Sequence, residues 1–408
     1  MKNVTKKLLC IGMAAALSIS ALAGCGSSDA GGESAPAEES AEKESASGQE
    51  DKEAAESAQA EEVKIGVLVA DVSGEEALAF RSYYENYIAG QYNVLFSYTE
   101  ELKDAAAEKS AIEKFAAQGY QAVISLSSSD RALQIKTCEE NEIYYAVASG
   151  MLDDDQYEQF KGSQYFAGQI GPSMETEYEA GFAMGQYFAE KGVKTVAIYG
   201  AFIPNPMHVY RTAGVLAGLG LTYGGASDEG GIVGQIFGDQ AVDLSKVDGD
   251  IQVVSYLQGY GDTTTDEINA AIQADPEAFI SVGMATTFFT QQLNGAGIEF
   301  SDIDSFTESN GQAIKEGKLV YLAGKYSSSI GPVFALVYNA VNGNVIRDND
   351  GNAVSISQGY LVATDAESFD SYYVTDNGED PIYNKAVLDT IIGDGVTYED
   401  LFSLVQSH

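Results

Sequence analysis

Short apolar runs alternate with helical segments over most of this chain, and this alternation is the strongest constraint on its fold. The run Lys64–Asp71 is almost continuously apolar, as expected of a strand that is covered on both faces of its sheet. Helices are expected where apolar residues recur at helical spacing, and strands where short apolar runs lie between turns. The first series of predicted elements comprises residues 64–71, 75–89, 92–98, 104–118, 122–127, 130–142, 144–149 and 165–170. This order is typical of an α/β unit with a parallel sheet.

A second α/β unit of similar size follows a predicted helix at Met174–Lys191. Gly181 and Gly185 share one face of this helix with bulky apolar residues, and we expect the two glycines to let the helix approach a sheet closely. The second series comprises predicted strands at 194–200, 231–237, 251–257, 278–284 and near 304–307, with helices at 207–219, 264–274 and 286–295. No sequence repeat relates the two units.

A third section combines strands and helices in a different order. Its predicted elements are a strand at 319–323, a helix at 332–341, a strand at 360–363, and helices at 382–392 and 397–405. Within it, Asp348–Asn352 hints at a calcium loop, but the twelfth position is Gly359 and not glutamate, so a polar turn is predicted instead. The earlier run Asp153–Asp155 is predicted to be a solvated loop.

The N-terminal segment has the features of a secretion signal. A start that carries three lysines precedes the apolar run Leu8–Ala23, which is shorter than the roughly 20 residues that a membrane-spanning helix needs. The stretch Leu22–Cys25 resembles the bacterial lipobox, and this resemblance implies that residues 1–24 are removed and that Cys25 carries lipid. A plain signal peptide with an incidental cysteine is the alternative. Residues 25–62 predict a disordered acidic linker, because they hold almost no bulky apolar side chain.

The composition excludes several classes of partner and cofactor. The formal net charge is −39, and such acidity argues against nucleic acid and against direct binding of anionic lipid headgroups. Contact with the membrane is therefore expected through the lipid anchor only. With two histidines, no histidine-based metal site is expected, and no motif indicates a cofactor or an enzyme. Cys138 is expected to be a small buried hydrophobe, with a reactive thiol as the minor alternative.

The order of elements over residues 63–365 resembles the type I periplasmic solute-binding proteins of the ribose-binding kind. Three pieces carry the resemblance: the strand at 64–71, the helix start Arg211-x-x-Gly214 after the strand at 194–200, and the late segment Gly317–Gly343. The resemblance implies an α/β fold of two Rossmann-like parallel-sheet lobes, which three chain crossovers join as a hinge around a ligand cleft. By matching elements, lobe 1 comprises residues 63–172 and 327–357, and lobe 2 comprises residues 173–326 and 358–408.

Candidate ligand-binding residues follow from the rule that ligands lie beyond the carboxyl ends of parallel strands. A buried polyol needs a partner for each hydroxyl, which charged and amide side chains supply best. The candidates are Asp71, Ser128, Asp130, Asn205, Arg211, Tyr260, Asp262, Glu308, Lys325 and Tyr326. Arg211 is the first choice, because an arginine at this helix start commonly reaches the ligand in the resembled family; a salt bridge is its alternative. Asp130 is the second choice, and a helix N-cap is its alternative.

Several positions depart from the pattern of the resembled sugar-binding proteins. These often have an Asp-Arg pair after the fourth strand, where this chain has Ser149-Gly150-Met151. They often have an Asn-Asp pair where this chain has Met284-Ala285, and a glutamine at the last crossover, where this chain has Lys325 and Tyr326. These departures argue against a simple aldopentose or aldohexose. The stretch Phe202–Met207 resembles the nucleoside-binding lipoproteins of the basic-membrane-protein kind, so a nucleoside stays open as the ligand.

The function that the resemblance implies is capture of a small polar ligand, most simply a sugar or a sugar derivative. The expected protein is a monomer on the extracytoplasmic side of the cell membrane, and it delivers its ligand to a separate ABC permease without making or breaking a bond. A sensory receptor that presents ligand to a membrane kinase is the alternative of the same fold. An anchored carbohydrate hydrolase is the alternative from the enzymes, although no catalytic motif supports it.

Overall fold

The structure is a computed structural model that describes residues 61–200, 205–258 and 263–408. These residues belong to one compact unit that begins at Gln59. The predicted signal peptide, Cys25 and nearly all of the predicted linker lie outside the described residues. Two of the candidate ligand-binding residues, Tyr260 and Asp262, also lie outside them, and so do residues 202–204 of the stretch that resembles nucleoside-binding lipoproteins.

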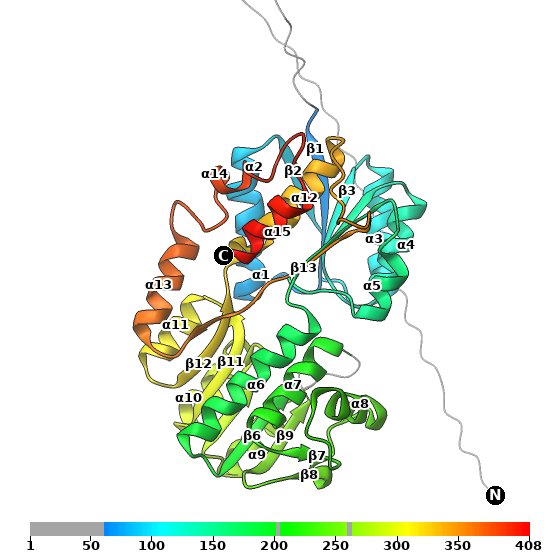
Figure 1. Cartoon of the computed structure of the whole chain (residues 1–408). Coiled ribbons are helices and arrows are strands. Elements are labelled where there is room, and N and C mark those ends of the chain that lie inside the picture. The colour runs from blue at the N-terminus through cyan, green and yellow to red at the C-terminus, as the bar shows by residue number, and fades with distance from the viewer. Residues whose placement is uncertain (1–60, 201–204, 259–262) are drawn as a thin grey trace, which may run out of the picture. The chain divides into compact units, whose positions relative to one another are not determined.

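The first lobe is built on a six-stranded, fully parallel sheet (Figure 1). The strand order is β13-β5-β4-β3-β1-β2. The strands are β1 (Val63–Val69), β2 (Val94–Tyr98), β3 (Ala122–Leu126), β4 (Tyr144–Ala148), β5 (Phe166–Gly171) and β13 (Val354–Ser357). Because β1, β3, β4 and β5 are buried almost throughout, they match the near-continuous apolar runs of a sheet that is covered on both faces.

Helices cover both faces of this first sheet. One face packs against α3 (Ala105–Ala117), α4 (Arg131–Glu140) and α5 (Asp154–Phe160). The other face packs against α1 (Glu75–Ser82), a π-helical segment (Tyr83–Ile88), α2 (Ala89–Gln91), a 3-10 turn (Ser327–Ile330) and α12 (Gly331–Val341). Cys138 is buried in the first of these two cores, and burial raises the pKa of its thiol. The prediction of a small buried hydrophobe is confirmed.

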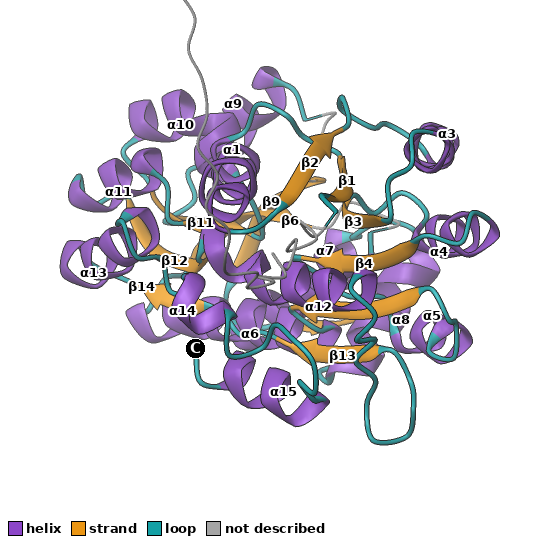
Figure 2. Ribbon diagram, turned by 90° about the horizontal axis from the view of Figure 1, so that it is seen from above, coloured by secondary structure: helices purple, strands orange, loops and turns teal. Residues whose placement is uncertain are grey.

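The second lobe repeats this arrangement around a sheet with the order β14-β12-β11-β10-β6-β9. Figure 2 shows β14, β12 and β11 side by side in this sheet. Its strands are β6 (Thr195–Gly200), β9 (Gln252–Gln258), β10 (Ala278–Ser281), β11 (Glu299–Ser305), β12 (Leu319–Lys325) and the antiparallel edge strand β14 (Leu361–Ala363). One face packs against α6 (Met174–Lys191), α7 (Pro206–Gly218) and α8 (Glu229–Asp239). The other packs against α9 (Thr265–Gln273), α10 (Ala285–Ala296), α11 (Glu308–Lys315) and α13 (Ala366–Asn377). A short ribbon of β7 (Thr222–Tyr223) and β8 (Val247–Asp248), with a 3-10 turn at Leu244–Lys246, completes this lobe.

The chain passes between the two sheets at three connections. It leaves the first sheet between β5 and α6, returns between β12 and α12, and leaves again between β13 and β14. The sequence predicted two parallel-sheet lobes joined by several crossovers, and this fold class is confirmed.

The C-terminal segment differs from the predicted division of the chain. Helix α13 packs in the second lobe, where Phe369 joins its core. Residues 383–405 then return to the first lobe, where Tyr383, Leu388 and Leu401 join the core beside α12. Short helices α14 (Lys385–Leu388) and α15 (Tyr398–Gln406) belong to this segment. The segment 378–382 is therefore a fourth passage between the lobes, because the apolar side chains after it match the face of α12.

Glycines hold α6 and α7 in direct backbone contact. A Cβ atom at Gly181 would collide with the carbonyl of Arg211, and one at Gly214 would collide with the carbonyl of Tyr178. Gly185 and Gly218 make equivalent approaches along the same pair of helices. The prediction that the glycines of α6 approach a sheet is wrong: they face α7, because both helices have glycines at a spacing of four residues.

Two local predictions are also wrong. Residues 231–237 form part of α8 and not a strand, since Ile232, Val233 and Ile236 recur at helical spacing and Asp228 caps the helix by accepting from the amide of Gly231 at 3.0 Å. The acidic run Asp153–Asp155 is not a loop but the N-cap and first turn of α5, where carboxylates are favoured by the helix dipole. The predicted turn at Asp348–Asn352 is present, since the Asp348 carboxylate accepts from the amides of residues 350 and 352.

Replacement of Gly214 by alanine is expected to destabilise the protein by about 1–3 kcal/mol, because the added methyl group forces α6 and α7 apart. Gly234→Ala is the matched control, since Gly234 lies within α8 and an added methyl group there would point into open space. This control is expected to stabilise by about 0.5–1 kcal/mol, the helix preference of alanine over glycine. Urea unfolding of both variants measures the difference. Equal effects would contradict the inferred role of the helix contact.

Candidate functional site

A polar network joins the carboxyl ends of strands from the two lobes. Lys325, at the end of β12, donates from Nζ to the hydroxyl of Ser149, directly after β4, at 2.8 Å. The same Nζ pairs with Oε1 of Glu76 on α1 at 3.0 Å. Ser305, at the end of β11, donates to that carboxylate oxygen at 2.9 Å. The carboxyl edges of the two sheets therefore face each other across this network, as expected of a ligand site in a two-lobed α/β protein.

A second contact joins the lobes beside the first. Glu75 accepts a hydrogen bond from the hydroxyl of Ser309 at 2.6 Å, in the first turn of α11. An anionic side chain is favourable there, because the N-terminus of a helix carries partial positive charge. The candidate residue Glu308 precedes Ser309, and its side chain is exposed.

Arg211 lies at the centre of a buried cluster in the second lobe. Its Nε donates to Oε2 of Glu177 on α6 at 2.6 Å, and its Nη2 donates to Oε1 at 3.2 Å. Nη2 also donates to the hydroxyl of Tyr360 at 2.6 Å, and Nη1 donates to the carbonyl of Val282 at 2.8 Å. Arg211 is 4% exposed and Glu177 is 1% exposed. A buried ion pair of this kind is stable only when its remaining donors are also satisfied, and each guanidinium nitrogen has a protein acceptor.

Burial shifts the protonation of two groups next to this ion pair. It raises the pKa of the Tyr360 hydroxyl, whose oxygen lies 3.0 Å from Oε2 of Glu177 and donates to that carboxylate. Burial, and then the positive charge of Arg211, lower the pKa of His208 to about 3. His208 is therefore neutral at physiological pH.

Arg131 lies on the first-lobe side of the site. It is the first residue of α4, and its Nη1 donates to the carbonyl of Met151 at 2.6 Å in the loop after β4. Its guanidinium lies against Gly150, where a Cβ atom would be only 3.2 Å from Nη2. Beside it, buried Glu108 accepts from the amides of Ser129 and Asp130, each at 3.0 Å, and so fixes the loop after β3.

Several candidate residues fix the local backbone at the strand ends. The Asp71 carboxylate accepts from the amides of Ser73 and Gly74 at 2.9 and 3.1 Å before α1. Asp130 caps α4 by accepting from Leu133, and Asn205 caps α7 by accepting from Met207. The N-cap alternative for Asp130 is thus present, and its contact with a ligand stays a prediction.

The remaining candidates differ in what surrounds them. Ser128 is exposed after β3, and its hydroxyl lies at a strand end as the rule requires. Tyr326 packs its ring at 5.7 Å from Phe306 and 6.3 Å from Tyr372. Lys325 joins the two lobes, and Arg211 is held by Glu177. Ligand contacts of all these residues stay predictions.

Sequence reasoning missed four residues that the structure places in this site: Glu76, Arg131, Glu177 and Tyr360. Glu177 is separated from Arg211 by 34 residues, and Tyr360 by 149. The matching glycine spacing on the two helices was a signal for Glu177, because helices in backbone contact bring their neighbouring side chains together. No sequence signal singled out Tyr360 among 25 tyrosines.

Two buried carboxyl groups lie on β11 behind the network. Asp302 accepts from the hydroxyl of Ser281 and from the amide of Thr286, both at 2.9 Å, and burial raises its pKa to about 6. Burial and nearby Glu76 raise the pKa of Asp304. Hydrogen bonds tie Asp302 to the start of α10, so it positions that helix.

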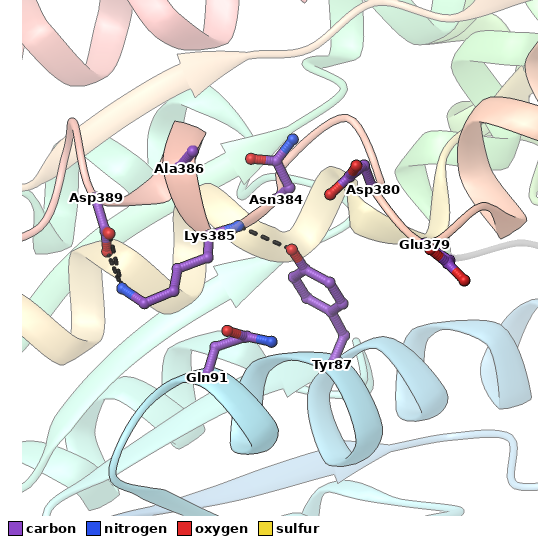
Figure 3. A pocket seen from close by; sticks show the side chains of 8 residues that line it. All are labelled: Tyr87, Gln91, Glu379, Asp380, Asn384, Lys385, Ala386 and Asp389. Atoms are coloured by element: carbon purple, nitrogen blue, oxygen red, sulfur yellow. Dashed lines mark hydrogen bonds and ion pairs between the residues drawn. The ribbon is translucent and has the colours of Figure 1, made fainter.

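Two cavities lie near the connections between the lobes and the C-terminal segment. The first, of about 210 Å³, lies along the connections between the lobes and includes Lys325, Tyr326 and Tyr360 in its lining. The second, of about 390 Å³, lies between the π-helical segment and residues 379–389 (Figure 3). In Figure 3, Tyr87 reaches the backbone amide of Lys385, which donates to its hydroxyl at 2.9 Å. The second cavity contains none of the candidate residues.

Within the described ranges, no group of three or more acidic, histidine or cysteine side chains is arranged to hold a metal ion. Across the same part of the chain, no helix is both long enough and apolar enough to cross a membrane.

Solved structures of similar shape are periplasmic solute-binding proteins. The arabinose-binding component of an ABC transporter from Shewanella sp. ANA-3 matches with 15% identity and a TM-score of 0.53, over 80% of this chain and 98% of that one. A solute-binding protein from Bacillus halodurans C-125 with bound myo-inositol matches with 15% identity and a TM-score of 0.56, over 78% and 99%. One from Actinobacillus succinogenes 130z with bound D-allose matches with 15% identity and a TM-score of 0.54, over 76% and 100%.

No protein-family model and no curated protein sequence matches this chain. At 15% identity, the likeness to the solved structures shows the fold. The chain has the fold of the type I periplasmic solute-binding proteins, and the resemblance noted in the sequence is confirmed at this level.

Glu177→Gln is expected to destabilise the protein by about 3–5 kcal/mol, because it leaves the buried charge of Arg211 without a counter-charge. Tyr360→Phe is expected to cost about 1.5–3 kcal/mol, the usual range for a hydrogen bond to a charged group. Glu113→Gln is the control, since Glu113 forms an exposed pair with Lys109 at 3.8 Å and should change stability by less than about 1 kcal/mol. Urea unfolding at one pH compares the three variants. A cost for Glu177→Gln as small as for the control would contradict the role of the ion pair.

The contribution of His208 to the stability of the protein is expected to fall as pH drops below 6.5. Its pKa is lowered from 6.5 to about 3 in the folded protein, so between these two values the unfolded chain binds a proton that the folded chain does not. The stability that the neutral His208 contributes is therefore present above pH 6.5 and is lost on acidification. His208→Gln removes this contribution. The free energy of unfolding of the wild type minus that of the variant should therefore decrease from about pH 7 to about pH 5. A difference that does not depend on pH would show that His208 is accessible to protons in the folded state.

Proposed function

We propose that this protein captures a small polar ligand, a sugar or a sugar derivative, between its two lobes. The observation that carries this proposal is the pair of opposed carboxyl edges, where polar side chains of both lobes meet at Lys325, Ser149 and Glu76. Three solved proteins of the same fold are described with bound arabinose, myo-inositol and D-allose, which supports a ligand that is rich in hydroxyl groups. Sites of this kind work by binding and lobe closure, and no bond of the ligand changes.

The proposed partner is an ABC permease in the membrane, which receives the ligand from the closed form. In this proposal Cys25 carries lipid after removal of residues 1–24, and the acidic linker to residue 62 lets the folded part reach the permease from the extracytoplasmic surface. The proposed division of the chain into two lobes follows the two sheets, so that both lobes contribute residues to the ligand-binding site. The protein is proposed to act as a monomer, because one copy contains both edges of the site.

Thermal unfolding of the purified protein with sugars, polyols, nucleosides and amino acids tests the proposal. A ligand at about 100 times its dissociation constant should add about 2.7 kcal/mol of stability, so the correct class should raise the melting temperature by several degrees. Hits among sugars or polyols support the proposal. Hits only among nucleosides would replace the proposed ligand, and conversion of the ligand to a product would indicate an enzyme.

Ser128→Ala should weaken binding of any ligand found in that screen about 5- to 10-fold, the effect of one lost hydrogen bond. Ser110→Ala is the matched control, because this exposed serine lies in the middle of α3, which packs on one face of the first sheet. Arg211→Ala should abolish the rise in melting temperature that the ligand causes, whether Arg211 contacts the ligand itself or only orients Glu177. Calorimetry on the three variants gives the affinities, and an unchanged affinity in Arg211→Ala would contradict the assignment of the site.

A further inference from the structure

Arg131 is an arginine whose single hydrogen-bond acceptor within the described residues is a neutral backbone carbonyl. The chain contains four arginines. Arg81 pairs with Glu85 at 2.9 Å, Arg211 pairs with Glu177, and Arg347 donates to three backbone carbonyls. Among the described residues, Arg131 donates only to the carbonyl of Met151. Its Nε is buried and has no hydrogen-bond partner there.

No acidic side chain in the described part of the chain neutralises Arg131 directly. The ion pairs within 4.0 Å do not include it. Glu108 and Glu177 act on it at longer range, but the first accepts from the loop after β3 and the second from Arg211. This is unusual in a protein with 61 acidic and 22 basic residues, because carboxylates are available at most surfaces.

The position of Arg131 connects this cation to the proposed ligand site. Its guanidinium lies against Gly150 and Met151, directly after the carboxyl end of β4. Gly150 adjoins Ser149, whose hydroxyl accepts a hydrogen bond from Nζ of Lys325. Two other cations near the sheet edges are matched by carboxylates: Lys325 by Glu76 and Arg211 by Glu177. Protein groups of the described chain leave Arg131 without a matched carboxylate.

A guanidinium in such a place favours an anionic ligand. It stays protonated at any physiological pH, and its planar fork of N–H donors fits a carboxylate in a two-point contact. Burial away from water strengthens this contact and makes an unmatched charge costly. A singly charged group suits the site better than a phosphate dianion, because the carboxylate of Glu108, which forms no ion pair within the described residues, also acts on this guanidinium.

We infer that the ligand is a sugar acid whose carboxylate is bound by Arg131, in the loop after β4, while its hydroxyl groups meet the polar side chains at the other strand ends. This inference rests on the proposed function and narrows its ligand class from neutral sugars to polyhydroxy carboxylates. It agrees with the departures at Ser149–Met151 and at Lys325 from the pattern of neutral-sugar binders.

Isothermal titration of the purified protein with matched pairs of ligands tests the inference. The pairs are D-galacturonate with D-galactose and D-glucuronate with D-glucose, and D-glucose 6-phosphate serves as the phosphate probe. At least one uronate should bind on the order of 10- to 100-fold more tightly than its parent hexose, the range for a charge-assisted contact. Its affinity should also fall with added salt, while that of the hexose should not.

Arg131→Gln should remove the preference for the acid and leave the affinity for the parent hexose within about 3-fold, since only the carboxylate contact is lost. Arg131→Lys should retain part of the preference, because the charge remains without the two-point geometry. Arg81→Gln is the control, because Arg81 is exposed and its charge is matched by Glu85 on the next turn of the same helical segment. It should change neither affinity.

Stability without ligand separates a binding role of Arg131 from a structural one. Arg131→Gln should keep or raise the melting temperature of the free protein, because an unmatched buried charge is removed. A large loss of stability together with an unchanged preference for the acid would assign Arg131 to the scaffold and overturn the inference. Equal binding of uronate and hexose, or tighter binding of the phosphate, would overturn it while leaving the proposed function intact. Binding of neither sugars nor sugar acids would overturn both.

Discussion

The contact between α6 and α7 is the constraint on which the site of the second lobe depends. Glycines at a spacing of four residues on both helices bring the two backbones together. At this separation the side chain of Glu177 reaches the guanidinium of Arg211 from the facing helix. A larger residue at any of these glycines would force the two helices apart, which would strain this buried ion pair in addition to the apolar contacts around it.

Arg211 and Arg131, on the two sides of the site, have different roles. Arg211 has an acceptor on each nitrogen, so it holds α6, α7 and the connection at Tyr360 in one arrangement. Arg131 is anchored through a single carbonyl, that of Met151 in the loop after β4. In the inferred ligand site, the neutralised cluster of the second lobe would supply a fixed surface, and the unmatched cation of the first lobe would recognise the charge of the ligand. Such preorganisation reduces the entropy lost when a ligand binds.

The sequence predicted the fold class well, because strands buried on both faces give continuous apolar runs and parallel strands require helical connections. It misassigned residues 231–237, since a short apolar run rich in glycine fits a strand or a helix equally well. In the site, the strand-end rule found Lys325 and the loop of Ser149. It missed Glu76, Arg131, Glu177 and Tyr360, because their importance comes from contacts between elements that are distant in the sequence.

The fourth passage of the chain between the lobes, at residues 378–382, has a consequence for the energetics of opening. A five-residue segment spans at most about 17 Å, and it ties α13 of one lobe to the core residue Tyr383 of the other. Each added covalent connection reduces the range of open arrangements and thus the entropy that favours opening. If the protein binds its ligand by lobe closure as proposed, the binding-competent form would then make up a larger share of the free protein, and less of the intrinsic affinity would be lost to the conformational equilibrium.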